Sequence, residues 1–417
     1  MTSDSATGRR VAVIGAGQAA AQLALSLRSG GFADPIVIIG DEPFLPYQRP
    51  PLSKKFLTER PPPDSLFLRP ASFWSERNVT LKLGVAAAAV DLKRRIVTLA
   101  DGSEISFHTL VFATGTRARS LPLPGAALGG VFSLRSIGDV RRLRPALDAA
   151  NRVAILGGGY IGLETAAVMR GEGREAIVLE AEDRVLKRVT APAVAAFFDR
   201  VHRERGVDIR CGMRVAAILG DDTRASALKL ADGSVVAADA ILLAAGAQAN
   251  DDLARASGLD CQDGILVDEL TRTAVPDVYA IGDCARFPSR RYGRRIRLEC
   301  VQNAIEQAKA AAAAILGAAE PYDPVPWFWS DQYDIKLQIA GLFDGHDTAT
   351  EAGEAAAGRF SVEYRQNGRL IAVDAVNEAR AHMLARRRIA EETSGEQAAL
   401  QGAAGPASGP IAAQSMH

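Results

Sequence analysis

Cysteine and histidine are scarce in this chain, which has four cysteines and five histidines among 417 residues. The cysteines, Cys211, Cys261, Cys284 and Cys300, form no C-x-x-C motif and have no paired histidine. This pattern argues against a disulfide scaffold and against a structural zinc site. We therefore expect no metal site, and we expect the protein to work in a reducing cytoplasm.

Long apolar runs and an excess of one sign of charge are also absent. No run reaches the roughly 18 apolar residues that span a bilayer, so we expect no membrane-spanning segment. Residues 1–10 carry an acid and two arginines, which does not match a signal peptide. The 49 Lys and Arg balance the 49 Asp and Glu, and this balance argues against a chain that coats nucleic acid or a membrane surface. A sum of charges cannot show a local patch.

A dinucleotide-binding pattern occurs near the start of the sequence. Apolar residues 11–14 lead into the glycine-rich residues 15–20, a helical stretch follows, and a second apolar run at 36–39 ends before two acids. Strand, glycine turn, helix, strand and acid is the order of a βαβ unit that binds a dinucleotide. Backbone N–H groups and a helix N-terminus would contact the pyrophosphate, and one of the two acids would bind the ribose. The candidate residues are Gly15, Gly17, Ala19, Ala20, and Asp41 or Glu42.

The same pattern occurs a second time. Apolar residues 152–156 lead into Gly157 to Gly162, and a strand at 175–179 ends at Glu180. Glu180 lies 23 positions beyond Gly157, close to the spacing of about 20 expected for a ribose-binding carboxylate. Two such units imply two dinucleotides bound by two domains. The candidate residues of the second unit are Gly157, Gly159, Tyr160, Ile161, Gly162 and Glu180.

Four spaced motifs carry a family resemblance. They are Leu45-Pro-Tyr-Gln-Arg-Pro-Pro-Leu-Ser-Lys54, the fingerprint at Gly157, Gly282-Asp-Cys-Ala-Arg286 and Trp327-Phe-Trp-Ser-Asp-Gln-Tyr333. From about Arg10 to about Arg388 the chain resembles the flavin-dependent pyridine-nucleotide oxidoreductases, and within them the oxygenase-coupled ferredoxin reductases. The resemblance implies an α/β fold with two Rossmann-like dinucleotide-binding domains, glutathione-reductase-like, and a small α+β C-terminal interface domain.

The resemblance also implies a division of the chain. The expected parts are 1–115 as the first segment of the FAD-binding domain, 116–249 as the NADH-binding domain, 250–325 as the second FAD segment, 326–405 as the interface domain and 406–417 as a disordered tail. Strand candidates in the interface domain are 335–339, 360–364 and 370–373. The tail is expected because its composition is rich in Gly, Ala, Ser and Pro.

Further cofactor contacts follow from the resemblance alone. Those to FAD are Arg49, Lys54, Ala87, Ala113, Thr114, Gly115, Arg135, Gly282, Asp283, Val301 and Trp329, and those to NADH are Glu164, Ala245 and Gly246. Asp283 would accept a hydrogen bond from the ribityl chain, unless it is a plain helix N-cap. Glu180 would pair with a free 2′-hydroxyl and repel a 2′-phosphate, which favours NADH. Arg184 is the nearby cation that leaves minor NADPH use open.

Three residues are catalytic candidates by resemblance: Lys54, Glu164 and Trp329. Lys54 would lie near the flavin N5 and stabilise negative charge that develops there. Glu164 would hold Lys54 and contact the nicotinamide amide, although a surface Glu and a solvated Lys are the alternative. Trp327 and Trp329 alternate in a strand-like run and should face one side. Trp329 would lie near the flavin, and Trp327 could equally be a core aromatic.

Cysteine is absent where related disulfide reductases carry a C-x-x-x-x-C pair and where related oxidases and peroxidases carry one cysteine. Residues 47–53 of this chain occupy that region. Thiol chemistry at the flavin therefore has no obvious nucleophile, and no cluster suits an iron–sulfur centre. The flavin should be the only redox group, so the electron acceptor must come from outside.

An arginine-rich segment suggests the acceptor. Six arginines occur within twelve positions without an intervening acid: Arg286, Arg290, Arg291, Arg294, Arg295 and Arg297. A positive face beside the flavin would steer an acidic [2Fe–2S] ferredoxin, which would receive electrons one at a time and feed a haem-thiolate monooxygenase or Rieske-type oxygenase. The alternatives are an NADH oxidase or diaphorase, and a redox-sensing, DNA-associated flavoprotein resembling apoptosis-inducing factor. No basic stretch is interleaved with aromatics, so we expect no nucleic-acid partner.

Overall fold

The computed structural model describes residues 8–403, with side chains as far as residue 392. The predicted tail at 406–417 lies outside these residues. Within the described range, none of the helices combines the length and apolar character needed to cross a bilayer.

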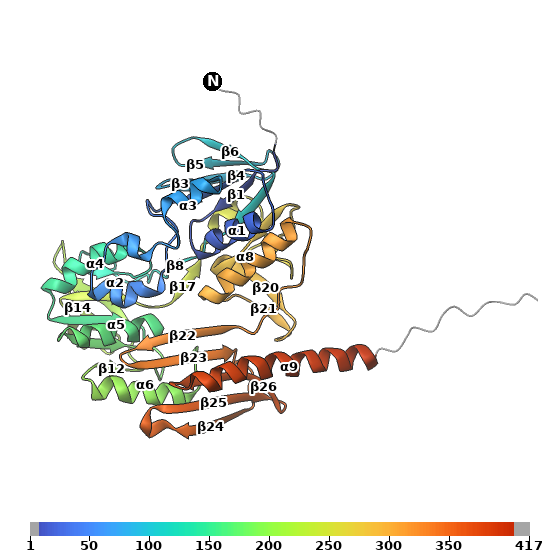
Figure 1. The fold of residues 1–417 in the computed structure, drawn as a ribbon. Coiled ribbons are helices and arrows are strands. Elements are labelled where there is room, and N and C mark those ends of the chain that lie inside the picture. Colours follow the sequence, from blue (N-terminus) through green and yellow to red (C-terminus); the bar gives the residue numbers. More distant parts are fainter. Residues whose placement is uncertain (1–7, 404–417) are drawn as a thin grey trace, which may run out of the picture.

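The first domain is built on a parallel sheet. Its strand order is β19-β7-β1-β2-β3. The strands are β1 (Val11–Ile14), β2 (Ile36–Gly40), β3 (Val79–Leu83), β7 (Thr109–Phe112) and β19 (Val278–Ala280). Four of them are buried along their whole length, which is why they are continuous apolar runs. Helices α1 (Gln18–Ser29) and α8 (Val301–Ile315) pack side by side on one face (Figure 1). Two segments far apart in the chain therefore share one sheet.

The second domain repeats this arrangement between those two segments. Its parallel sheet has the order β12-β11-β10-β16-β9. The strands are β9 (Val131–Phe132), β10 (Arg152–Leu156), β11 (Glu175–Leu179), β12 (Asp208–Arg210) and β16 (Ala240–Leu243). Its helices are α4 (Ile137–Ala149), α5 (Tyr160–Gly171) and α6 (Pro192–Glu204). A capping box of Ser136 and Asp139 begins α4.

Small, mostly antiparallel sheets and short helices complete the two domains. The sheets are β4 (Ala87–Asp91) with β5 (Ile96–Leu99) and β6 (Glu104–Ser106), β13 (Val215–Gly220) with β14 (Ala225–Leu230) and β15 (Val235–Ala237), and β18 (Ile265–Leu266) with β20 (Ala285–Ser289) and β21 (Arg294–Ile296). Strands β8 (Thr116–Ala118) and β17 (Ala247–Ala249) pair where the chain passes between the domains. The short helices are α2 (Lys55–Thr58), α3 (Ala71–Glu76) and α7 (Asp252–Ala256).

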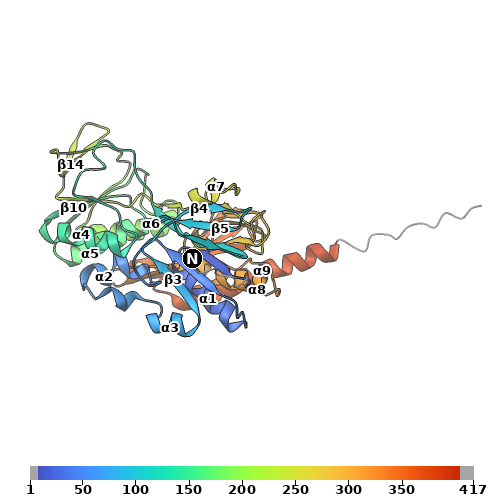
Figure 2. The same ribbon diagram turned by 90° about the horizontal axis from the view of Figure 1, so that it is seen from above.

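The C-terminal domain is one antiparallel sheet and a long helix. The sheet order is β22-β23-β26-β25-β24. Its elements are β22 (Trp327–Gln332), β23 (Ile335–Gly341), β24 (Thr348–Glu354), β25 (Arg359–Gln366), β26 (Arg369–Val376) and α9 (Ala379–Ala403). The three predicted strands are confirmed as β23, β25 and β26. Strand β24 is exposed along its whole length and gives no alternating apolar signal. Figure 2 shows α9 extending away from the body of the molecule.

The three domains share one hydrophobic core. It joins Leu52 of the first domain, Ala166 and Phe198 of the second, and Tyr364 and Val376 of the C-terminal sheet. Such continuous burial holds the domains in one arrangement and so fixes whatever lies between them. This is the predicted architecture: two Rossmann-like domains and a small α+β domain.

Candidate functional site

A cavity of about 1900 Å³ lies where the three domains meet. The carboxyl ends of both parallel sheets open into it, since Ala113 after β7 and Leu156, Leu179 and Leu243 at the ends of β10, β11 and β16 all line it. Ligands of open α/β sheets bind at this edge of the strands. The aromatic start of β22 closes the cavity from the C-terminal domain.

The first glycine turn contains one position that only glycine can occupy and one glycine that faces open space. Gly15 has φ +108°, and a Cβ there would lie 2.1 Å from the Ala113 carbonyl oxygen. Gly17 precedes α1, and no described atom comes within 4 Å of the position a Cβ would take. Among residues 8–403, no side chain caps the first turn of α1. The backbone N–H groups at the start of α1 are therefore free to donate, and the space beside Gly17 has no described side chain in it. This arrangement suits a pyrophosphate.

The second glycine turn repeats this geometry. Gly157 has φ +113°, and its Cβ would lie 2.5 Å from the Ala244 carbonyl oxygen. Gly159 precedes α5 with the same open space around it in the described structure. A Cβ on Gly162 would lie 2.0 Å from the Gly157 carbonyl oxygen, so Gly162 allows the close approach of helix and strand. Two glycine cradles, each with a geometry that suits a pyrophosphate, therefore open into one cavity.

The acids that follow the strands differ in their contacts. Asp41 is exposed and lines the cavity, whereas Glu42 accepts hydrogen bonds from Tyr47 (2.8 Å) and Arg49 (2.8 Å). This geometry favours Asp41 over Glu42 for the first ribose. Glu180 lines the cavity and accepts the backbone N–H groups of Gly158 at 2.7 Å and Glu182 at 2.8 Å. Its carboxylate is held at the mouth of the second cradle.

Lys54 and Glu164 form an ion pair at the cavity, in which the carboxylate is buried and the lysine is partly exposed. Lys54 Nζ lies 2.7 Å from Glu164 Oε2, and Glu164 is only 3% exposed. The same carboxylate also accepts hydrogen bonds from the hydroxyls of Ser53 (2.6 Å) and Ser330 (2.7 Å). A buried carboxylate needs such partners, and here they come from the first and the C-terminal domains, whereas Glu164 belongs to the second. Lys54 lines the cavity, which rules out the alternative of a solvated lysine and a surface Glu.

Asp283 is held by a cation at the cavity wall. It follows β19 within the 3₁₀ turn Gly282–Cys284, and Arg135 Nη2 lies 2.8 Å from its carboxylate. The N-cap of this turn is Ile281, and Asp283 lies within the turn, so the N-cap alternative is not supported. Arg297 donates to the Asp283 backbone carbonyl at 3.1 Å.

Aromatic rings line the cavity from β22 and α5. Trp327 and Trp329 lie on the same side of the strand with ring centroids 5.7 Å apart, as predicted from their alternation. Phe328, on the opposite side, packs 4.6 Å from Tyr160. All four rings line the cavity.

The cavity brings together most of the residues expected at the two cofactors. Those that line it are Gly15, Gly17, Ala19, Asp41, Arg49, Lys54, Ala113, Thr114, Gly115, Arg135, Gly157, Gly159, Tyr160, Ile161, Glu164, Glu180, Ala245, Gly246, Gly282, Asp283, Val301 and Trp329. Four do not. The side chain of Ala20, in α1, is fully buried in the core, and Glu42 accepts hydrogen bonds from Tyr47 and Arg49. Gly162 packs against Gly157. Ala87 of β4 pairs with Leu99 of β5 in a small antiparallel sheet.

The sequence analysis missed several residues of the cavity. Ser53 and Ser330 both hold Glu164, and both lie inside motifs that carried the resemblance, which was the available signal. Arg188 and Arg214 line the cavity near Glu180. Arg184, the cation suspected from sequence, donates instead to the Lys187 carbonyl and is not among the described lining residues.

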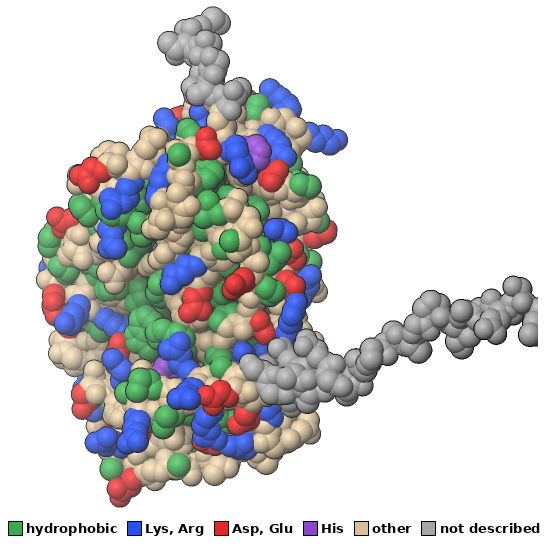
Figure 3. Space-filling model, turned by 45° about the vertical axis from the view of Figure 1, so that its right-hand side comes forward, with side chains coloured by type: hydrophobic (Ala, Val, Ile, Leu, Met, Phe, Trp, Pro, Cys, Tyr) green, Lys and Arg blue, Asp and Glu red, His purple; other side chains and the backbone are tan. Residues whose placement is uncertain are grey.

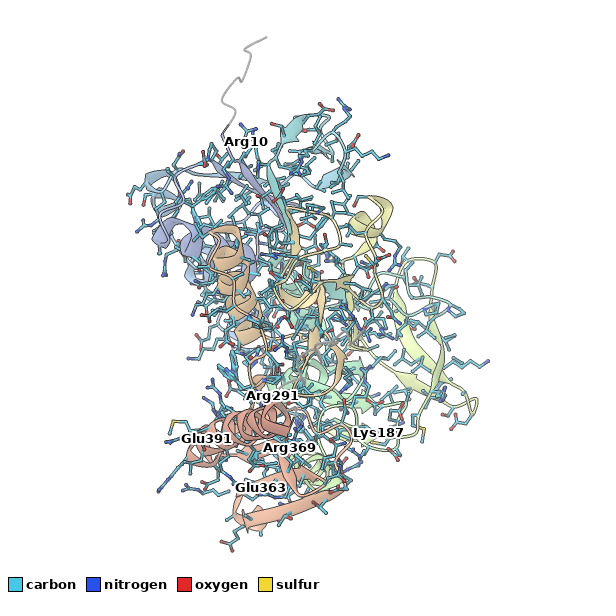
Figure 4. The ribbon with its side chains drawn as sticks, turned by 90° about the vertical axis from the view of Figure 1, so that its right-hand side faces the viewer. Arg10, Lys187, Arg291, Glu363, Arg369 and Glu391 are labelled. Atoms are coloured by element: carbon cyan, nitrogen blue, oxygen red, sulfur yellow. The ribbon has the colours of Figure 1, made fainter. Side chains whose placement is uncertain are left out.

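The predicted arginine face is only partly exposed. Arg291 is 8% exposed and donates to the Ile389 carbonyl of α9; Figure 4 shows it beside Arg369 against this helix. Arg297 pairs with Asp263 and Glu299 and its side chain is 10% exposed. For these two arginines the prediction of an exposed docking charge is wrong, because the Ile389 carbonyl and the carboxylates of Asp263 and Glu299 pack against them. Figure 3 shows both signs of charge interspersed on this side of the molecule.

The cysteines have no features of a reactive site. All four lie within the described residues and are free thiols. Burial raises the pKa of Cys300, the one that lines the cavity, to about 12, and it also raises the pKa of Cys284. A thiol that is not ionised is a poor nucleophile.

Comparison with known proteins identifies the family. A family model described as pyridine nucleotide-disulphide oxidoreductase matches residues 9–313, and one described as reductase C-terminal matches residues 327–406. The chain belongs to the pyridine nucleotide-disulphide oxidoreductase family. The predicted family, fold class and oxidoreductase activity are thereby confirmed, and membership implies FAD and NAD(H) as cofactors.

Named relatives narrow the likeness to one branch. A ferredoxin–NAD(P)⁺ reductase from a Sphingomonas species is 43% identical over 381 residues, covering 91% of this chain and 92% of that protein. Putidaredoxin reductase from Pseudomonas putida is 40% identical over 372 residues, with 88% of each chain covered. The crystal structure of the covalent putidaredoxin reductase–putidaredoxin complex matches with a TM-score of 0.89 and 38% identity, covering 92% of this chain and 94% of that chain.

Proposed function

We propose that this protein is an NADH-dependent flavoprotein reductase that passes electrons through FAD, one at a time, to a [2Fe–2S] ferredoxin serving an oxygenase. The observation that carries the proposal is the pair of open glycine cradles on one cavity that the Lys54–Glu164 ion pair also lines. The relatives named above include a ferredoxin reductase and putidaredoxin reductase, and this supports a ferredoxin acceptor.

The first cradle, with Asp41, Arg135 and Asp283, would hold FAD. The second cradle, with Glu180, would hold NADH. When bound, FAD accepts a hydride from NADH and releases its electrons singly, which is the chemistry the cofactor itself supplies. The four free thiols accord with action in a reducing cytoplasm.

Lys54 would supply positive charge at the cavity wall. An ammonium that is already fixed by Glu164 needs little reorganisation when negative charge develops beside it, and such preorganisation lowers the barrier. Glu164 would position Lys54 and contact the carboxamide of the nicotinamide. Trp329, at the C-terminal wall, would cover the side of the site from which an acceptor approaches.

Purification and steady-state turnover test the proposed function. We expect a yellow protein with about one FAD per chain, and NADH oxidation that accelerates severalfold when an acidic [2Fe–2S] ferredoxin is added. Equal NADH oxidation with oxygen alone would identify an oxidase, and reduction of ferricyanide without any ferredoxin effect would identify a diaphorase. A colourless, folded preparation would contradict the proposal outright.

The docking face for the ferredoxin would use the exposed arginines of the β20–β21 region. Arg290 pairs with Glu269 at 2.6 Å and Arg294 with Asp344 at 2.8 Å, and all four side chains are at least one-third exposed. Exposed pairs of this kind contribute about 0–1 kcal/mol, so an incoming carboxylate can replace the acid at little cost. Arg295 is exposed beside them.

Charge reversal tests this face. Changing Arg290, Arg294 and Arg295 to Glu should slow ferredoxin reduction by about tenfold at low salt, because steering falls with the loss of charge, and should flatten its dependence on ionic strength. Reduction of ferricyanide by NADH is the control and should not change. A parallel fall in both activities would show damage to the flavin site and contradict docking at this face.

A further inference from the structure

A line of buried polar side chains extends from Glu164 away from Lys54. Ser330 Oγ donates to Glu164 Oε1 at 2.7 Å, and Gln332 Nε2 donates to Ser330 Oγ at 3.2 Å. His202 Nε2 lies 2.9 Å from Gln332 Oε1, and the Tyr333 hydroxyl lies 3.2 Å from His202 Nδ1. Ser330, Gln332 and His202 are fully buried. None of these four residues has a part in the function proposed above.

The hydrogen-bonding capacity of each group sets the direction of this line. An ionised carboxylate only accepts hydrogen bonds, so Ser330 must use its single hydroxyl proton on Glu164. Its lone pairs are then free to accept from the amide of Gln332. That amide turns its oxygen to His202, which must therefore carry its proton on Nε2.

The far end of the line obeys the same constraint. Burial lowers the pKa of His202 to about 4, helped by Arg205 and opposed by Gln332 and Asp199. The imidazole is therefore neutral at physiological pH, and with Nε2 protonated its Nδ1 can only accept. Tyr333 must then donate to it. Every donor in the line points toward Glu164.

The opposite orientation breaks the line at the carboxylate. If Gln332 were turned over, Ser330 would donate to the amide oxygen, and Glu164 Oε1 would lose its donor. A buried acceptor without a partner is costly. The observed direction is therefore the one that satisfies all five groups.

The backbone holds the end of the line in an unusual conformation. Tyr333 has φ +58°, in the left-handed region that a residue with a bulky side chain rarely adopts. The Arg205 guanidinium lies 4.2 Å from the Tyr333 ring centroid and pairs with Asp334 at 2.6 Å. These contacts tie the turn after β22 to α6, so the strained tyrosine is held from two sides.

We propose that Ser330, Gln332, His202 and Tyr333 form a one-directional hydrogen-bond chain that fixes the Glu164 carboxylate and, through it, Lys54. They are positioning residues, because they act through Glu164. The chain joins the C-terminal strand β22 to helices α5 and α6 of the second domain, so docking of the C-terminal domain completes the site. Only the kinetic consequence rests on the function proposed above; the direction of the chain does not.

Nuclear magnetic resonance of ¹⁵N-labelled histidine in the full-length, FAD-loaded protein tests the direction. The signal that disappears in His202→Gln should belong to a neutral ring protonated on Nε2 from pH 5 to pH 8. Gln332→Glu should raise the pH at which this ring titrates by about one unit or more, because a carboxylate favours the imidazolium. Titration of the wild-type ring near pH 6.5, or protonation on Nδ1, would overturn the proposal whether or not the protein reduces ferredoxin.

Rapid-mixing kinetics of flavin reduction by NADH test the positioning role. Ser330→Ala and Gln332→Leu should lower the limiting rate by about fivefold, the effect of losing one buried hydrogen bond, and Tyr333→Phe by less. The dissociation constant for NAD⁺ should change by less than about twofold, since a lost transition-state contact moves the rate and not the binding.

A matched control is Ser289→Ala. Ser289 is a buried serine that donates to Asp323 at 2.8 Å, and Ser289 is not among the described lining residues of the cavity. Its loss should leave the reduction rate unchanged. An equal fall in this control, or unchanged rates in Ser330→Ala and Tyr333→Phe, would overturn the positioning role. Tyr333→Phe removes only one hydroxyl, at the partly exposed end of the hydrogen-bond chain. The positioning role can therefore still be tested if Gln332→Leu does not fold.

Discussion

At the scale of single residues, we propose that Glu180 makes the second cradle select its nucleotide by charge. Glu180 is fixed by the N–H groups of Gly158 and Glu182, so it cannot turn aside for a 2′-phosphate. Lys187 lies nearby, but it is paired with Glu182 at 2.9 Å and Asp183 at 3.2 Å. Arg188 and Arg214 line the same cavity. Removal of Glu180 would therefore leave a site of positive charge.

Substitution of Glu180 should change this choice. In Glu180→Ala the KM for NADH should rise about tenfold, the effect of one lost hydrogen bond to a charged group, while use of NADPH improves. Glu180→Gln keeps an acceptor oxygen and removes the charge, so it should relax discrimination with a smaller rise in KM. Steady-state kcat/KM with both nucleotides measures the effect. Glu175→Gln is the control, because Glu175 is exposed at the start of β11 and is not among the described lining residues of the cavity. If discrimination stays unchanged in Glu180→Ala, Glu180 is not the selecting residue.

At the scale of elements, predictability follows the strength of the local pattern. The sequence predicts the buried strands β1, β2, β10 and β11 from their apolar runs. It also predicts the turns after β1 and β10, because each of these turns contains a position that only glycine tolerates. Strand β24 could not, because both its faces are exposed and pairing with β25 alone keeps it extended.

The site shows the same limit. Lys54 and Glu164 were expected to pair because of a resemblance, and their 2.7 Å contact joins residues 110 positions apart. No local pattern predicts that Ser330 and Gln332 reach Glu164 and His202, since this depends on how β22 docks on α5 and α6. For the arginine segment, the sequence predicted too much. Its run of positive charges suggested a continuous basic face, but in the structure acids from other parts of the chain pair with several of these arginines.

At the scale of the whole molecule, one buried carboxyl lies within the core that the domains share. Asp374 of β26 accepts a hydrogen bond from the Tyr364 hydroxyl at 2.6 Å, and that hydroxyl accepts the N–H of Ala191 at the start of α6. Asp374 Oδ1 has no hydrogen-bond partner among the described residues. Burial raises the pKa of Asp374 to about 7, against the opposing effect of the Tyr364 hydrogen bond.

We expect this shift to make the stability of the joined domains depend on pH. The carboxyl of an unfolded chain titrates near pH 3.9, so between about pH 4 and pH 7 the folded protein holds a proton that the unfolded chain has lost. The free energy of unfolding must therefore fall as pH rises through this window. The loss from this one group is about 4 kcal/mol and is complete above about pH 7.

Thermal unfolding of the FAD-saturated protein from pH 5 to pH 8 measures the effect. Asp374→Asn mimics the protonated carboxyl, so its Tm should exceed that of the wild type by a margin that widens with pH and levels off above pH 7. The exposed Asp222 offers a control, because its replacement by Asn should leave a margin that is independent of pH. A constant margin for Asp374→Asn would mean that the folded protein carries Asp374 ionised throughout. In that case the buried carboxyl would stabilise the joined domains only through its hydrogen bond with Tyr364.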